Sequence, residues 1–113
     1  MTGKTRDNQI VYIAKAFANE DQFFAAIAQV AMPPEVVSVT PRLGTDWDEE
    51  PAVFLEVTLA DNAIPRSELL SFTRQVRRAI VRQVRPLEEW GVLPHFRFLT
   101  QTERSRIKEP AWA

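Results

Sequence analysis

Two segments in the middle of the chain alternate apolar and polar side chains with a period of two, and this pattern constrains the fold more than any other feature. In residues 36–43 and again in residues 52–59, the odd-numbered positions are apolar, which places their side chains on one face of an extended strand. Residues 44–51 join the two segments, so the pattern predicts a β-hairpin. Pro41 cannot donate a ladder hydrogen bond, which puts the first strand at a sheet edge or at a bulge.

Segments with helical spacing flank this hairpin. Apolar residues three or four positions apart predict a helix over residues 20–31, with Asn19 as its N-cap. The same spacing returns over residues 65–85, and Pro86 should end or kink that second, longer helix.

Two further segments complete the predicted order of elements. Phe96 and Phe98 alternate with polar neighbours and predict a last strand. Residues 9–18 fit either a first helix or a strand, because residues 10–13 (Ile-Val-Tyr-Ile) are β-prone. The order is therefore α-β-β-α-β, or β-α-β-β-α-β if the chain begins with a strand.

The expected fold class is α+β, an antiparallel sheet of three or four strands with helices packed on one face. A chain of 113 residues forms one domain, which here spans residues 1–113 with loose tails at residues 1–8 and 104–113. The predicted core residues are Val37, Val39, Val53, Leu55, Val57, Phe96 and Phe98 on the sheet, and Phe24, Ile27, Leu69, Phe72, Val76 and Ile80 on the helices.

The net charge of −1 conceals two segments of opposite charge. Residues 35–64 contain seven acids and one base, a net charge of −6, whereas residues 65–113 contain ten bases and five acids, a net charge of +5. The acidic turn and the basic helix are therefore both candidate docking surfaces. The balanced total argues against a dedicated nucleic-acid binder, which carries a clear excess of bases.

Several function classes lack their usual marks in this sequence. The chain has no cysteine, which excludes disulfides, a thiol nucleophile and a thiolate metal site. It has no long apolar run and no secretory leader, so we expect a cytoplasmic protein that does not bind membranes. Its three glycines are scattered, so there is no glycine-rich phosphate loop, and we expect no cofactor and no metal site.

The basic segment concentrates its arginines on one face of the predicted long helix. The members of this arginine stripe lie four, four and three positions apart: Arg74, Arg78, Arg82 and Arg85. The planar guanidinium fork binds phosphates and carboxylates in bidentate fashion, so the stripe is a candidate site for an RNA backbone or an acidic partner. A solvated helix face explains the same spacing equally well.

The acidic segment concentrates its charge in the turn of the hairpin, where four acids surround a tryptophan: Asp46, Trp47, Asp48, Glu49 and Glu50. Carboxylates could hold Mg²⁺ or Ca²⁺, but the spacing differs from a calcium-binding EF-hand loop, and a solvated connection is the favoured interpretation. A tryptophan in such a turn is a candidate contact for a partner protein. Together with Trp90, it is the predicted interaction surface.

His95 is the single histidine of the chain. A histidine at the edge of a strand is more often a packed or surface residue than a catalyst, and no acid stands beside it in the sequence to orient it. A metal-dependent enzyme that combines His95 with the acidic turn would need the two to meet in the folded protein.

Two resemblances follow from these residues. The order of elements over residues 35–103, with a hairpin, an arginine-rich helix and a closing strand (Phe96-Arg97-Phe98), resembles the KH-like core of the bacterial ribosome-binding factor A family. That family implies binding of small-subunit ribosomal RNA during assembly. The chain departs from it in its acidic hairpin, and it lacks the GxxG loop of RNA-clamping KH domains.

The second resemblance covers residues 36–100 and rests on the amino-acid sequence of four segments: Val37 to Val39, Asp46 to Phe54, Leu69 to Arg85, and Pro94 to Phe98. These segments resemble a group of small uncharacterised bacterial proteins with a similar acidic turn. Members of that group tend to be encoded beside a small partner gene, as in toxin–antitoxin pairs, which implies a protein partner.

The function predicted from the sequence is that of a non-enzymatic, protein-binding accessory protein, the antitoxin-like or regulatory half of a bacterial two-protein module. If the partner is a nuclease, the acids of the turn would imitate phosphates. The alternative is an RNA-binding module that uses the arginine stripe, and a metal-dependent enzyme is the third hypothesis. An exposed edge strand, or Phe54 and Leu99 on the outer face of the sheet, would also favour a homodimer.

Overall fold

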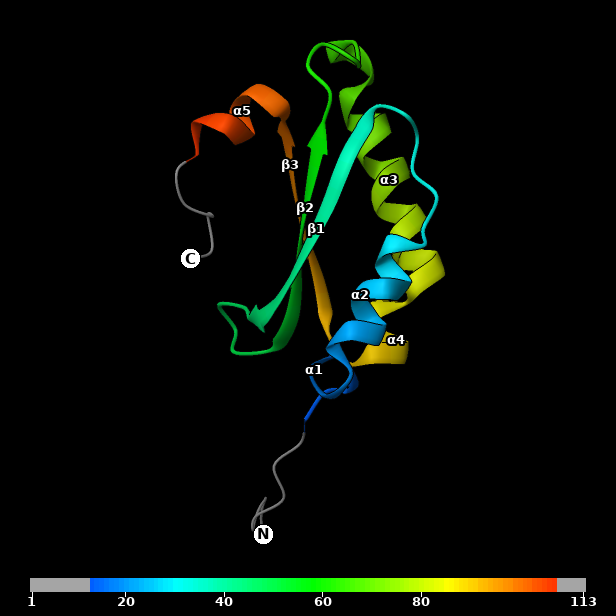
Figure 1. The fold of residues 1–113 in the computed structure, drawn as a ribbon, viewed down its shortest axis with the longest axis vertical. Coiled ribbons are helices and arrows are strands. Elements are labelled where there is room, and N and C mark those ends of the chain that lie inside the picture. The colour runs from blue at the N-terminus through cyan, green and yellow to red at the C-terminus, as the bar shows by residue number, and fades with distance from the viewer. Residues whose placement is uncertain (1–12, 108–113) are drawn as a thin grey trace, which may run out of the picture.

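A three-stranded sheet with a layer of helices against one face makes up the protein (Figure 1). The structure is a computed structural model and describes residues 13–107. Along the chain its elements are α1 (Lys15–Ala18), α2 (Glu20–Ala28), β1 (Val36–Thr45), β2 (Pro51–Leu59), a 3-10 turn (Arg66–Glu68), α3 (Leu69–Val84), α4 (Pro86–Trp90), β3 (Leu93–Thr100) and α5 (Gln101–Arg106).

The α+β class is confirmed, but the sheet is mixed rather than antiparallel. β1 and β2 form the predicted hairpin and pair antiparallel, whereas β3 pairs with β2 in parallel, in the order β1-β2-β3. The reason is the crossover: α3 and α4 carry the chain back along the sheet, so β3 starts at the same end as β2. Of residues 9–18, predicted to be a helix or a strand, residues 15–18 form helix α1, and residues 9–12 lie outside the described residues. Within residues 13–107 the sheet has three strands.

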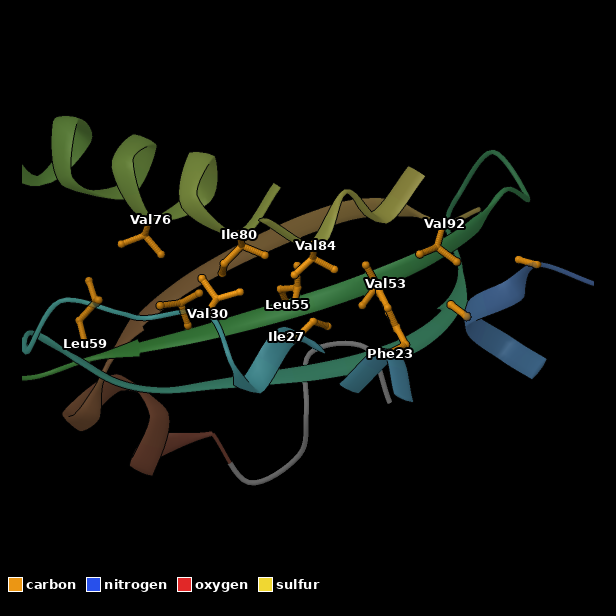
Figure 2. Close-up of a cluster of buried hydrophobic side chains, with 13 residues drawn as sticks. Phe23, Ile27, Val30, Val53, Leu55, Leu59, Val76, Ile80, Val84 and Val92 are labelled. Carbon is orange, nitrogen blue, oxygen red and sulfur yellow. The ribbon is translucent and has the colours of Figure 1, made fainter. Parts of the chain in front are cut away.

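The core lies between the central strand and the helices (Figure 2). Val53 and Leu55 of β2 are fully buried, and they face Val76 and Ile80 of α3 and Phe23 of α2, which are fully buried as well. Full burial of such side chains stabilises a fold by roughly 1.5–3 kcal/mol each. This row therefore fixes which face of the sheet the helices cover.

Two predicted core residues are exposed instead. Val37 is 50% exposed because the pairing of β1 shifts register between Val36 and Ser38, a bulge that turns the strand locally. Leu69 is 42% exposed, and it occupies the first position of α3. Periodicity alone could not show either departure.

The helix boundaries differ from the predicted ones at three points. α2 begins at Glu20 but ends at Ala28, and the Asn19 side chain donates to the Lys15 carbonyl (3.1 Å) instead of capping α2. The predicted long helix begins with a 3-10 turn at Arg66–Glu68, and α3 starts only at Leu69. Its predicted break at Pro86 is confirmed, because Arg85, with φ of 54°, ends α3 and Pro86 opens α4. Proline suits this first position because its missing N–H has no partner there in any helix.

A short helix occupies part of the predicted C-terminal tail. α5 covers residues 101–106 and is held at its start by a capping box, in which Thr100 and Glu103 each accept a hydrogen bond from the other's backbone N–H. It lies on the face of the sheet opposite α2, α3 and α4 (Figure 1), where Arg104 forms an ion pair with the buried Glu56. Residues 104–106 are therefore helical, and residues 108–113 lie outside the described residues.

Candidate functional site

The outer face of the sheet, defined here as the face opposite α2, α3 and α4, carries a row of three side chains. Arg42 on β1 pairs with Phe54 on β2, and Phe54 pairs with His95 on β3. Directly paired residues point to the same face of a sheet, and Val53 and Leu55, the neighbours of Phe54, point into the core. Phe54 is almost fully buried. On this face the guanidinium of Arg42 lies 5.4 Å from its ring, and the His95 ring stacks on it at 5.5 Å.

Asp46 fixes the hairpin turn, residues 46–50, onto this row. Its Oδ1 accepts hydrogen bonds from the backbone N–H groups of Asp48 (2.9 Å) and Glu50 (3.0 Å). Its Oδ2 lies 3.1 Å from Nε2 of His95, and the Asp46 side chain is only 3% exposed. The carboxylate therefore stabilises the turn internally and connects it to β3.

These contacts lower the pKa of the Asp46 carboxyl. The backbone N–H of Glu50 lowers the pKa of the Asp46 carboxyl most, partial burial opposes that shift, and the His95 side chain and the N–H of Asp48 lower the pKa further. An ionised carboxylate can only accept hydrogen bonds, so Nε2 of His95 carries the proton of this contact.

Trp47 is the most exposed large hydrophobic side chain of the described residues. It is 78% exposed, yet its ring is not free of contacts, because it lies 4.9 Å from the His95 ring at an angle of 52°. The turn is fixed by Asp46 and has Glu49 in the left-handed region with φ of 63°. A hollow of about 260 Å³ lies beside the ring. Its lining residues are Arg42, Gly44, Thr45, Asp46, Trp47 and Phe54.

Trp90 does not belong to this surface. It is half-buried, its ring lies 5.0 Å from Phe23 on α2, and the Lys15 ammonium lies 4.8 Å above it. Trp90 packs against the hydrophobic core on the helix side of the sheet, whereas Trp47 contacts His95 of the outer-face row. The interpretation of the two tryptophans as one contact surface is not supported by this placement.

The acidic turn divides into one structural carboxylate and three exposed ones. Asp46 is buried, whereas Asp48, Glu49 and Glu50 are exposed. Of the four acids that were predicted to imitate phosphates, only these three are therefore exposed to a partner. Within residues 13–107, no group of three or more histidine, cysteine, aspartate or glutamate side chains is arranged to hold a metal ion.

The arginine stripe lies on the solvent side of α3. All four of its members are exposed, and Arg85, at the break between α3 and α4, lies 3.8 Å from Glu89. Arg77 belongs to another face, with its guanidinium 5.6 Å from the Phe96 ring and 5.9 Å from the Phe98 ring. Guanidinium groups on the stripe are therefore available to a ligand.

One hypothesis from the sequence combined His95 with the acidic turn, and the structure places the two in contact. The sequence did not identify Arg42 and Phe54 as parts of the site. Their odd–even alternation with the core residues was visible, but the register that aligns them with His95 was not. None of the helices in residues 13–107 has the length and apolar character needed to span a membrane.

Comparison of the chain with protein families, curated proteins and solved structures finds no match. Its function is therefore inferred from the residues and their arrangement.

Proposed function

We propose that this protein is a non-enzymatic accessory protein that binds a partner protein through its hairpin turn, with Trp47 as the central contact. The observation that carries the proposal is the 78% exposure of a tryptophan that is nevertheless positioned by a ring contact with His95. Tryptophan is over-represented among the residues that contribute most to protein–protein binding.

The surroundings of Trp47 favour binding because they reduce its cost. A side chain that is already held in place loses less conformational freedom when a partner covers it. Here the contact of Asp46 with His95 and the two hydrogen bonds within the turn hold the backbone on which Trp47 sits. The ring is thus preorganised, and its exposed surface remains to be buried.

The charge of the turn indicates what kind of partner fits. Asp48, Glu49 and Glu50 are exposed beside Trp47, so a partner with basic side chains around an apolar or aromatic contact would be complementary in charge. Electrostatic complementarity of this kind accelerates association and rejects partners of the wrong charge. An accessory role in a bacterial two-protein module is the form of this proposal that the resemblance of the hairpin suggests.

Photo-crosslinking in the native host tests the proposal. The photoreactive residue p-benzoylphenylalanine replaces Asp48, which leaves Trp47 in place, and a matched control carries it in place of Leu70, which is 63% exposed on α3. We expect one dominant crosslinked protein from position 48, none from position 70, and loss of the product when Trp47→Ala is added. Equal products from both positions, or a product that persists in the Trp47→Ala variant, would contradict the proposal.

A second candidate function, RNA binding, is favoured by one observation, the exposure of the whole arginine stripe. Contacts with phosphates make the affinity fall steeply with salt concentration, and each lost contact reduces that dependence. If the stripe binds RNA, the triple variant Arg74→Gln, Arg78→Gln, Arg82→Gln should weaken RNA binding and flatten its salt dependence. Trp47→Ala should leave RNA binding unchanged.

A further inference from the structure

Within residues 13–107, β1 is at one edge of the sheet, and the hydrogen-bonding direction of its backbone can be assigned. Asp46 donates its N–H to the Glu50 carbonyl across the hairpin (3.0 Å), and bonded pairs alternate with non-bonded pairs in an antiparallel ladder. The register is continuous from Ser38 to Thr45, so even-numbered residues bond to β2. The N–H and C=O groups of Leu43 and Thr45 therefore point away from β2, toward the open edge.

Most of this edge is unsuited to pairing with another strand. Pro41 occupies an outward-pointing position and has no N–H to donate, and the bulge between Val36 and Ser38 bends the beginning of the strand. Both features are known ways in which proteins block edge-to-edge association. Among the described residues, the part of this edge that is left unpaired and unblocked is the end of β1, from Leu43 to Thr45.

Two hollows lie at this end of β1, one on each face of the sheet. The first has a volume of about 270 Å³ and lies on the helix side; it is lined by Ile13, Ala14, Phe17, Gly44, Thr45 and Pro51. The second, on the outer face, is the hollow of about 260 Å³ beside Trp47. Gly44 and Thr45 border both. Gly44 contributes only backbone atoms to the outer hollow, and a Cβ at this position would lie 3.4 Å from the Phe54 ring.

We infer that an extended segment of the partner protein adds to β1 at Leu43–Thr45 as an additional strand. Successive side chains of a strand point to opposite faces, so two neighbouring residues of such a segment would enter the two hollows. Strand addition of this type takes its affinity from main-chain hydrogen bonds and its specificity from the pockets for alternate side chains. This inference rests on the proposed function and names the part of the partner that binds.

The chemistry of the hollows defines the sequence of that segment. The helix-side hollow is apolar, with Ile13 63% and Phe17 42% exposed, and suits an aliphatic side chain. The outer hollow presents the Trp47 ring and suits an aromatic side chain that stacks on it. The three exposed acids of the turn then favour basic residues next to this pair. The expected motif is an aliphatic residue adjacent to an aromatic one, flanked by lysine or arginine.

Selection from a library of random peptides displayed on phage, with the full chain as bait, tests this inference. A synthetic peptide of the selected consensus is then titrated by calorimetry against the wild type, Thr45→Pro and the matched control Thr45→Val. Thr45→Pro removes one outward-pointing N–H without affecting the bonds to β2, so affinity should fall about fivefold or more, the effect of one hydrogen bond. Thr45→Val keeps the N–H and should bind the peptide like the wild type.

Amide hydrogen exchange gives an independent readout on the unmodified protein. We expect the bound peptide to slow exchange at Leu43 and Thr45. A library that yields no binding peptide, or a peptide that leaves both amides at their unbound rates, overturns the inference. If that peptide still loses affinity in the Trp47→Ala variant, docking on Trp47 stands without strand addition. A dimer that protects the two amides in the absence of peptide would identify a second copy as the occupant and would also overturn it.

Discussion

Trp47→Ala should remove partner binding while leaving the fold almost unchanged. With 78% of Trp47 exposed, about one fifth of its surface is covered, which for a side chain of roughly 250 Å² is about 55 Å². At about 25 cal/mol per Å², this burial contributes about 1.4 kcal/mol, an upper bound because the unfolded chain is itself partly collapsed. We therefore expect the free energy of unfolding to fall by about 1 kcal/mol or less.

Urea denaturation followed by far-UV circular dichroism measures this change without relying on tryptophan fluorescence. In contrast, the affinity for the partner should fall by at least about 2 kcal/mol, roughly 30-fold, if Trp47 is a central contact. Leu70→Ala, which also truncates an exposed apolar residue, is the matched control and should affect neither quantity strongly. A loss of more than about 3 kcal/mol of stability in Trp47→Ala would mean that the ring has a structural role, and would refute this reasoning.

Three further predictions concern the stability of the fold. Phe54→Ala should cost about 3 kcal/mol of unfolding free energy, the lower end of the range for a buried phenylalanine, because its almost fully buried ring packs against the Arg42 guanidinium and the His95 ring. A loss below about 1 kcal/mol in urea denaturation would contradict this. The pKa of the Asp46 carboxyl is lowered first by the Glu50 N–H, and that of Asp61 first by the Thr102 hydroxyl. A carboxyl whose pKa is lower in the folded than in the unfolded protein stabilises the fold at pH values above its ordinary pKa of 3.8. This stabilisation is lost as the pH falls from 3.8 through the folded-state pKa. Thermal melts should therefore show stability decreasing as the pH falls below 3.8, and this decrease should be smaller in Asp61→Asn; an unchanged pH profile would count against the assignment. Arg104→Met should destabilise the protein by about 1–2 kcal/mol, less than for a fully buried pair because Arg104 is 45% exposed, and adding Glu56→Gln should restore part of the loss; a double variant no more stable than Arg104→Met would argue against the ion pair.

Features that depend on local spacing were predicted well from the sequence. The alternation around Val53 and Leu55 identified the hairpin and its buried face, because a strand's period of two requires no knowledge of the rest of the chain. The spacing of Arg74, Arg78 and Arg82 likewise placed them on the exposed face of a helix.

Features that depend on how distant segments meet could not be predicted. β3 runs parallel to β2 because of where the α3–α4 crossover ends. The residues of β3 themselves do not indicate this direction. The contact between His95 and Asp46 joins positions 49 residues apart, and it requires both the parallel register of β3 and the bend of the turn. Trp90 was expected at the surface, but its ring packs against Phe23 on α2. This packing is also a contact between distant segments, so the sequence pattern could not reveal it.

Affinity capture from the native host, carried out with and without nuclease treatment and with wild-type and Trp47→Ala bait, tests the central claim most directly. The account predicts a single protein that survives nuclease in near-stoichiometric amount and is lost from the Trp47→Ala sample. Recovery of RNA and RNA-bound proteins that disappear with nuclease, equally from both baits, would contradict it and would assign function to the arginine stripe.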